Sequence, residues 1–171
     1  MYLRNFGISI LTAILLTISS FSYADETCMS PYMQKIVGQE DYVYVWTLGV
    51  EGLGDEQDKL VTIDVSPKSK TYGKVVSVLS VGGRNEAHHS GLSDDRHYLW
   101  AGGLDSNKIF IFDVATNPRK PSLSKVVIDF VEKTGGIVGP HTFYALPGRM
   151  MVSGLSNNKD NGGRTGLAEY N

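Results

Sequence analysis

The chain has 171 residues, a net charge of -2 and 20% charged side chains, so it lacks the basic excess of a nucleic-acid-binding protein. Its single cysteine, Cys28, excludes a disulfide bond within the chain. Histidine is rare, with 4 residues, yet His88 and His89 are adjacent.

The N-terminal segment has the pattern of a secretory signal peptide. Arg4 lies in a short positive region, residues 6–21 are mostly apolar, and small residues precede a cleavage site after Ala24. We therefore predict a signal peptide at 1–24 and a periplasmic protein at 25–171. The alternative is a membrane anchor, but the apolar run is short for a ~20-residue span. After cleavage we expect no membrane segment.

The rest of the chain is predicted to be nearly all β. No segment combines a helical apolar period with helix caps. Short segments with alternating β-branched, aromatic and polar residues are separated by turns that contain Gly and Pro. Within 58–65, Leu60, Thr62 and Asp64 are expected on one face. Strands are expected at 41–49, 58–65, 74–80, 97–103, 107–114, 123–131, 141–146 and 149–156, with a further strand beginning near the C-terminus.

Two long segments repeat one pattern. Both segments have an Asp-Val strand end, a Pro-containing turn and a Lys-Val-Val strand. They are "LVTIDVSPKSKTYGKVV" (60–76) and "IFIFDVATNPRKPSLSKVV" (109–127). His89 and His141, 52 residues apart, are each followed by Arg and Gly. A repeat of ~40–50 residues with four strands is typical of a β-propeller blade. Because propellers close about 4–8 blades, we expect this chain to hold the first two to three blades of a longer protein.

The histidines are candidate metal ligands because innermost propeller strands meet near one axis. His88, His89 and His141 are expected to converge there, and imidazole suits copper and zinc. Adjacent strand residues point to opposite sides, so one of His88 and His89 should bind while the other orients it or moves protons. Glu86 is a candidate acceptor or further ligand. The alternative is a surface pair at a turn, since two imidazoles do not complete a metal site.

Other conspicuous residues are interpreted as structural. The Gly-rich segment 133–140 lacks the spacing of a phosphate-binding loop and is expected to be a turn. The remaining structural residues are a solvated or packing His97, the turn carboxylates Asp64 and Asp113, the core residues Trp46 and Trp100, and at least one core methionine of Met150 and Met151.

Several blocks together resemble the selenium-binding protein family. They are the two repeats, "EAHHSGLS" (86–93), "GPHTFYALPGRMMVSGLS" (139–156) and "NNKDNGGRTG" (157–166). The opening "ETCMSPYMQKIVGQEDYVYVWTLG" (26–49) is similar to the bacterial methanethiol oxidase branch of that family. The resemblance covers 25–171 and implies a seven-bladed, WD40-like propeller for the full-length family.

The resemblance also implies an activity. Members of this branch are periplasmic copper enzymes that oxidise methanethiol with O2 and water to formaldehyde, hydrogen sulfide and hydrogen peroxide. The matching copper ligands are His88, His89 and His141, and further histidines of the family pattern would follow Asn171. Thr47 stands where animal relatives carry a cysteine linked to selenium, so selenium binding is not predicted at that position.

Three functions therefore remain open from the sequence. One is a copper-dependent methanethiol oxidase, whose partners are a small thiol and O2, with a homo-oligomer as one possible assembly. The alternative is a non-catalytic exported β-propeller that binds a partner, a metal or selenium. A third function is a copper or zinc carrier without turnover. Tightly bound copper favours the oxidase or the carrier over the non-catalytic propeller, and thiol-dependent peroxide release then separates the oxidase from the carrier.

Overall fold

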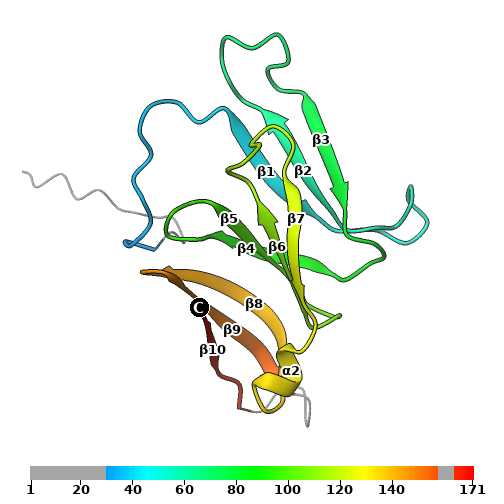
Figure 1. The fold of residues 1–171 in the computed structure, drawn as a ribbon. Helices are drawn as coiled ribbons and strands as arrows, with labels where there is room; N and C mark the ends of the chain where they lie inside the picture. Colours follow the sequence, from blue (N-terminus) through cyan, green and yellow to red (C-terminus); the bar gives the residue numbers. More distant parts are fainter. Residues whose placement is uncertain (1–29, 158–163) are drawn as a thin grey trace, which may run out of the picture.

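The computed structural model describes residues 30–157 and 164–171. The predicted signal peptide, its cleavage site at Ala24 and Cys28 lie outside the described residues. The described part of the chain forms three antiparallel sheets and one short helix, and the sheets follow one another along the chain (Figure 1).

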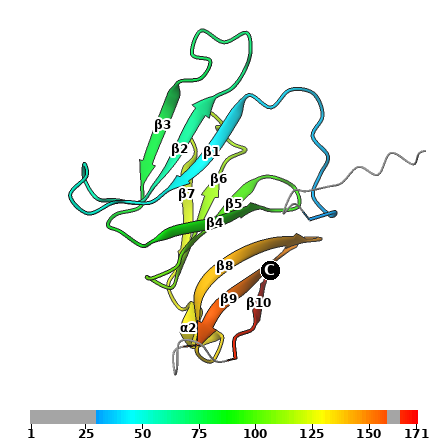
Figure 2. The same cartoon turned by 180° about the vertical axis from the view of Figure 1, so that it is seen from behind.

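Each sheet is built from consecutive strands, and the sheet in the middle of the chain also lies in the middle of the structure (Figure 2). The helix α2 (Phe130–Lys133) connects the second sheet to the third. In sheet order, the strands are β1 (Tyr42–Thr47), β2 (Lys59–Asp64) and β3 (Val75–Ser80); β4 (Ala87–Leu92), β5 (Tyr98–Gly103), β6 (Lys108–Asp113) and β7 (Ser122–Val127); and β10 (Leu167–Tyr170), β9 (Arg149–Asn157) and β8 (Ile137–Leu146).

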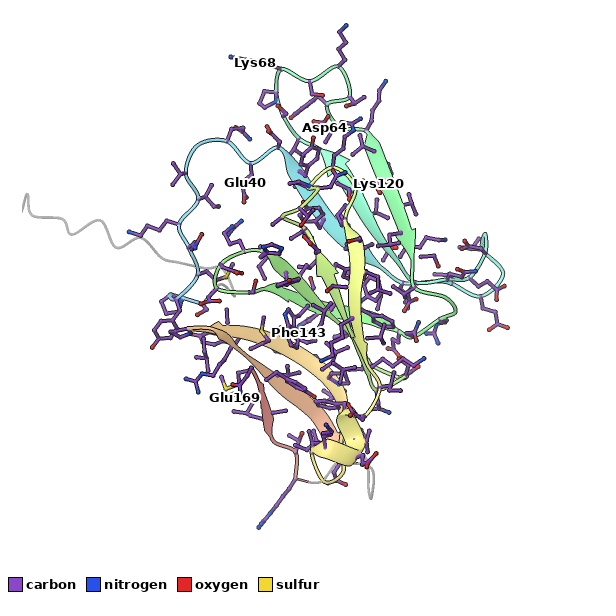
Figure 3. All side chains as sticks on the ribbon, in the orientation of Figure 1. Glu40, Asp64, Lys68, Lys120, Phe143 and Glu169 are labelled. Carbon is purple, nitrogen blue, oxygen red and sulfur yellow. The ribbon has the colours of Figure 1, made fainter. Side chains whose placement is uncertain are left out.

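Strand β6 explains why the sheets stack. Its "IFIF" run is buried on both faces, because successive side chains of a strand point to opposite sides. Phe110 and Phe112 pack with Leu60 of the first sheet, whereas Ile109 and Ile111 pack with Phe143 of the third. Figure 3 shows Phe143 in the layer between the second and third sheets. Full burial of each such side chain stabilises the fold by about 1.5–3 kcal/mol.

The repeat predicted from the sequence is confirmed. β2 and β3 of the first sheet correspond to β6 and β7 of the second, and each pair has a break in register at the matching place, after Thr62 and after Ile111. The prediction that Leu60, Thr62 and Asp64 share one face of β2 is also confirmed, and that face is buried.

The two repeated aspartates organise turns, as predicted. Asp64, at the end of β2 (Figure 3), accepts hydrogen bonds from the hydroxyls of Ser69 and Thr71, and these bonds lower its pKa. Asp113 accepts bonds from the backbone N–H and the hydroxyl of Thr116, which are the main causes that lower its pKa to about 2. Each carboxylate fixes the turn to the next strand.

The fold differs from the prediction in two places. The four-residue helix α2 was not expected, and it ends where Gly135 and Gly136 adopt positive φ before β8 begins. The expectation of a turn over 133–140 is only partly confirmed, because the turn covers 134–136 and residues 137–140 already belong to β8. Residues 87–92 form the strand β4, although this polar segment has no alternation that predicts one. In the ranges that the structure describes, no helix has the length and apolar character needed to cross a membrane.

Candidate metal centre

The three predicted histidines lie on the two strands that begin the second and third sheets. His88 and His89 are on β4, and His141 is on β8. These strands lie side by side: a Cβ added to Gly91 of β4 would come within 2.7 Å of the Phe143 carbonyl oxygen on β8. A glycine is therefore needed at this crossing, and the crossing brings the two histidine segments together.

The three imidazoles form one cluster. The ring centroids of His88 and His89 are 4.7 Å apart with planes at 21°, so these rings stack. The His141 ring lies 4.7 Å from His88 and 4.4 Å from His89. One ring nitrogen from each residue can be chosen so that all three lie within 4.8 Å of one another. A single metal ion can therefore be reached by all three side chains. Binding itself stays a prediction.

A β-bulge explains why both His88 and His89 join the cluster. Ala87 pairs with Gly103 and Ser90 with Ala101, so two residues of β4 lie opposite the single Gly102. Such a bulge re-aims the side chains of its strand. The expectation that His88 and His89 point to opposite sides is therefore wrong, because it holds only for a regular strand.

The third sheet has a bulge at the equivalent place. Pro140 pairs with Gly154 and Phe143 with Val152, so His141 and Thr142 together lie opposite Ser153. By this pairing His141 corresponds to His88, and Thr142 corresponds to His89. The spacing that matched His89 with His141 was one residue out of register, because the sequence alone does not show where the bulges begin.

Close backbone contact holds the two bulges together. A Cβ on Gly102 would lie 2.4 Å from the Pro140 carbonyl oxygen, so only glycine allows β5 to approach β8 there. The Gly102 carbonyl also accepts a 2.9 Å hydrogen bond from the indole of Trp46. Residues on both sides of the histidines are therefore fixed by packing rather than by the histidines themselves.

Burial favours the neutral form of the His141 imidazole. The pKa of His141 is lowered first by desolvation and then by the nearby His89 and His88 rings. A neutral imidazole has the free lone pair that metal binding requires. The rings of His88 and His89 are exposed and that of His141 is half-buried, so the cluster is open to solvent.

Glu86 does not join the cluster of ring nitrogens. Its backbone has a φ of 58°, unusual for a residue other than glycine. The pKa of Glu86 is raised first by a hydrogen bond with the Asp105 carboxyl and then by desolvation, and the charges of Arg84 and His88 oppose the rise. Glu86 is therefore paired with a second carboxyl beside the site.

The other candidate residues are structural, as predicted. His97 lies 3.4 Å from Asp113 through Nε2 and packs on the Tyr98 ring, away from the three histidines. Trp46 packs on Phe110 and Phe112 but is only half-buried, so its predicted place in the core is only partly correct. Met150 is buried in the core between the second and third sheets.

Sequence reasoning missed three polar residues, two beside the cluster and one that anchors a segment leading to it. The Thr142 hydroxyl lies 3.0 Å from His141 Nδ1, and the Thr142 N–H donates to Ser153 Oγ at 3.1 Å. Buried Asp58 accepts bonds from the N–H groups of Gly49 and Asn85, at 2.7 and 2.9 Å, and so anchors the segment that leads into β4. The bond from Thr142 to Ser153 depends on the pairing of β8 with β9, and the bonds of Asp58 join two separate connections of the chain, so neither has a visible sequence signal.

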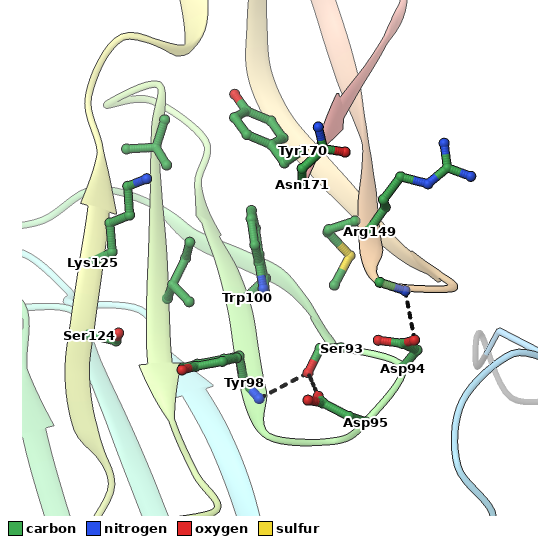
Figure 4. A pocket seen from close by; sticks show the side chains of 14 residues that line it. Ser93, Asp94, Asp95, Tyr98, Trp100, Ser124, Lys125, Arg149, Tyr170 and Asn171 are labelled. Carbon is green, nitrogen blue, oxygen red and sulfur yellow. Dashed lines mark hydrogen bonds between the residues drawn. The ribbon is translucent and has the colours of Figure 1, made fainter.

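A separate cavity of about 360 Å³ lies between the second and third sheets, and none of the three histidines lines it. Figure 4 shows Trp100 and Tyr98 facing Tyr170 across it, with the Gly148 N–H donating to Asp94. Trp100 thus lines a cavity wall and is only half-buried, so its predicted place in the core is only partly correct. The cavity lacks a cluster of metal ligands, and the histidine cluster remains the candidate site.

The antiparallel sheets stack in chain order, and the first strands of the second and third sheets meet at the histidines. This arrangement defines part of a β-propeller. The predicted fold class is therefore confirmed. The chain belongs to the family described as 56kDa selenium binding protein (SBP56), whose profile matches residues 23–169.

Named relatives agree with this family. A protein named methanethiol oxidase from Ruegeria pomeroyi is 61% identical over 168 residues, covering 98% of this chain and 38% of the relative. One of the same name from Hyphomicrobium sp is 62% identical over 150 residues, covering 87% of this chain and 34% of the relative. The X-ray structure of a hypothetical selenium-binding protein from Sulfolobus tokodaii matches with a TM-score of 0.69 and 31% identity, over 77% of this chain and 32% of that one.

Proposed function

We propose that this chain provides part of the copper site of a periplasmic, copper-dependent methanethiol oxidase. The observation that carries the proposal is the convergence of His88, His89 and His141, whose ligand atoms lie within 4.8 Å of one another. The names of the bacterial relatives at 61% and 62% identity support the substrate. Because the chain spans only 38% and 34% of those relatives, the activity is proposed for the protein as a whole.

The donor set fits copper. Imidazole nitrogen is a favoured ligand for copper, and three imidazoles leave room for a thiolate sulfur, which copper also binds well. Desolvation lowers the pKa of His141 and so favours the neutral ring, which is the form that binds a metal. The exposed rings of His88 and His89 leave the cluster accessible to a molecule as small as methanethiol.

The proposed reaction balances. Methanethiol, O2 and water give formaldehyde, hydrogen sulfide and hydrogen peroxide, so carbon loses two electrons and O2 gains two. The bound copper supplies the redox chemistry that no side chain of this chain offers. The residues of this chain hold the metal in place. Bulges in β4 and β8 aim the three imidazoles at one point, and Gly102 keeps the strands close enough for them to meet.

Localisation belongs to the same proposal. The segment before Ala24 has the composition of a cleaved signal peptide, and export would place the protein in the periplasm. N-terminal sequencing of the natural protein should find Asp25 as the first residue. A protein that retains residues 1–24 would contradict this part of the proposal.

The activity is tested on the natural, full-length protein. We expect it to contain copper, to consume methanethiol and O2, and to release formaldehyde, sulfide and peroxide, with all turnover lost on copper removal and restored by copper. Equal methanethiol consumption before and after copper removal would overturn the proposal. Copper without turnover would indicate a metal carrier, and a protein with neither would indicate the non-catalytic binding propeller.

A further inference from the structure

Thr142 occupies a distinctive place in the site. The two bulges are equivalent, so Thr142 takes the position in β8 that His89 takes in β4. In β4 this second position contributes an imidazole that stacks on its neighbour at 4.7 Å. In β8 it contributes a hydroxyl, whose oxygen lies 3.0 Å from His141 Nδ1.

The backbone of Thr142 is itself held in place. Its N–H lies in the bulge and donates instead to the side chain of Ser153, at 3.1 Å. A bulge leaves an extra residue outside the regular ladder, so this side-chain acceptor satisfies a group that would lack a partner. Ser153 therefore fixes Thr142, and Thr142 contacts the ring of the predicted ligand His141.

The contact between Thr142 and His141 matters because it can fix the tautomer of the His141 ring. A neutral imidazole carries one N–H and one lone pair, and the hydrogen bond to one nitrogen decides which nitrogen can bind a metal. If Nε2 binds, Nδ1 must carry the proton and requires an acceptor. The Thr142 hydroxyl oxygen is placed to accept it.

We propose that Thr142 is a positioning residue for His141: its hydroxyl accepts the Nδ1–H proton and leaves Nε2 as the metal-binding atom. This inference rests on the proposed function, since it assumes that the histidine cluster binds copper. It assigns a role to a residue outside the three ligands. It also explains why a hydroxyl, rather than a fourth imidazole, suits the second position of the bulge in β8.

The first test compares copper(I) affinities of full-length variants by competition with a chromophoric chelator. Thr142→Val removes the hydroxyl and should weaken copper binding by about 10- to 100-fold, the usual effect of losing a partner behind a metal ligand. Thr142→Ser keeps the hydroxyl and should restore the affinity. Thr47→Val is the matched control, because Thr47 is also a half-buried strand residue whose hydroxyl is hydrogen bonded, but to the Lys59 carbonyl.

The second test reads the ring directly by nitrogen-15 NMR of the copper(I)-loaded full-length protein, labelled at histidine. In the wild type and in Thr142→Ser, we expect His141 to show a protonated, slowly exchanging Nδ1 and a metal-bound Nε2. In Thr142→Val, the Nδ1 proton should exchange rapidly with water, or the ring should bind through Nδ1. A purely structural role for Thr142 would change neither signal.

Failure of the inference can be told from failure of the proposed function. Wild-type protein that binds no copper overturns the proposed copper site and this inference with it. Wild-type protein that binds copper while Thr142→Val matches it in affinity and in the His141 spectrum overturns the inference alone. If valine at this position prevents folding, Thr142→Ala and Thr142→Ser provide the same contrast in hydroxyl content, and equal affinities there would also overturn it.

Discussion

The rings of His88 and His141 lie with their centroids 4.7 Å apart, although the two residues belong to different sheets. Each is the first residue of a β-bulge on the first strand of its sheet. The sheets stack through separate apolar cores, so the convergence of the rings is a consequence of how the sheets pack.

The first prediction concerns the ligands. His88→Ala, His89→Ala and His141→Ala should each weaken copper binding by more than about 100-fold, a larger effect than the loss of a partner behind a ligand. The measurement is copper bound per chain after dialysis against a competing chelator. His97→Ala is the control, because His97 lies beside Asp113 and outside the cluster, and it should retain copper. Retention of copper by all three cluster variants would exclude this metal centre.

The second prediction concerns the glycine opposite the histidine pair. Gly102→Ala would place a Cβ 2.4 Å from the Pro140 carbonyl oxygen, a backbone atom that cannot move alone. We expect the free energy of unfolding to fall by about 1–3 kcal/mol, as for other overpacked sites, and copper affinity to fall as β5 and β8 separate. Urea unfolding and chelator competition measure the two effects.

The control for this substitution is Gly73→Ala. Gly73 has a φ of 72°, and a Cβ there would meet no atom within 4 Å, so alanine should reduce stability by about 1–2 kcal/mol through backbone strain alone. Copper affinity should not change in this variant. If it falls as much as in Gly102→Ala, the loss reflects general destabilisation rather than the contact with Pro140.

The strands that could be predicted are those whose own side chains carry the signal. Buried and half-buried residues alternate in β2, whereas β6 has a continuous apolar run. The burial of each strand follows from its pattern. β4 could not be predicted, because "AHHSGL" has one apolar residue at each end and its strand conformation depends on pairing with β5. Strand pairing is a property of two segments, and a single segment does not encode it visibly.

The same limit applies to the candidate site. The candidate ligands could be identified by their position in a repeat, since equivalent strands of a propeller meet near one axis. These ligands are His88, His89 and His141. The direction of the His88 and His89 side chains could not be predicted, because a bulge is defined by the number of residues opposite it on the partner strand. Thr142 was missed for the same reason.

The third prediction concerns the anchor of the segment before β4. Asp58 is fully buried and accepts the N–H groups of Gly49 and Asn85, which belong to separate connections. Asp58→Ala leaves both donors without this acceptor and should lower the free energy of unfolding by about 3 kcal/mol. Asp55→Ala is the control, because Asp55 is exposed and its contacts, with Lys59 and the Gln57 N–H, lie at the surface, so the substitution should have little effect. Equal unfolding midpoints for the two variants would contradict this role.

The fourth prediction concerns pH. Hydrogen bonds from Thr116 lower the pKa of Asp113 to about 2, below the value of about 3.9 expected in the unfolded chain. A lowered pKa in the folded state means that the ionised carboxylate stabilises the fold fully above about pH 4 and progressively less as pH falls toward 2. Asp113→Asn should therefore be less stable than the wild type at pH 5, and the difference should shrink at pH 2.5.

Urea unfolding of both proteins at the two pH values measures this change. Thr116→Val offers an independent check, because it removes the hydroxyl that donates to Asp113 while leaving the carboxylate in place. The pKa of Asp113 should then rise toward its ordinary value, as read by carbon-13 NMR of the carboxyl group, and part of the dependence on pH should disappear. An Asp113 carboxyl that titrates near 4 in the wild-type protein would show that these bonds do not stabilise its charged form.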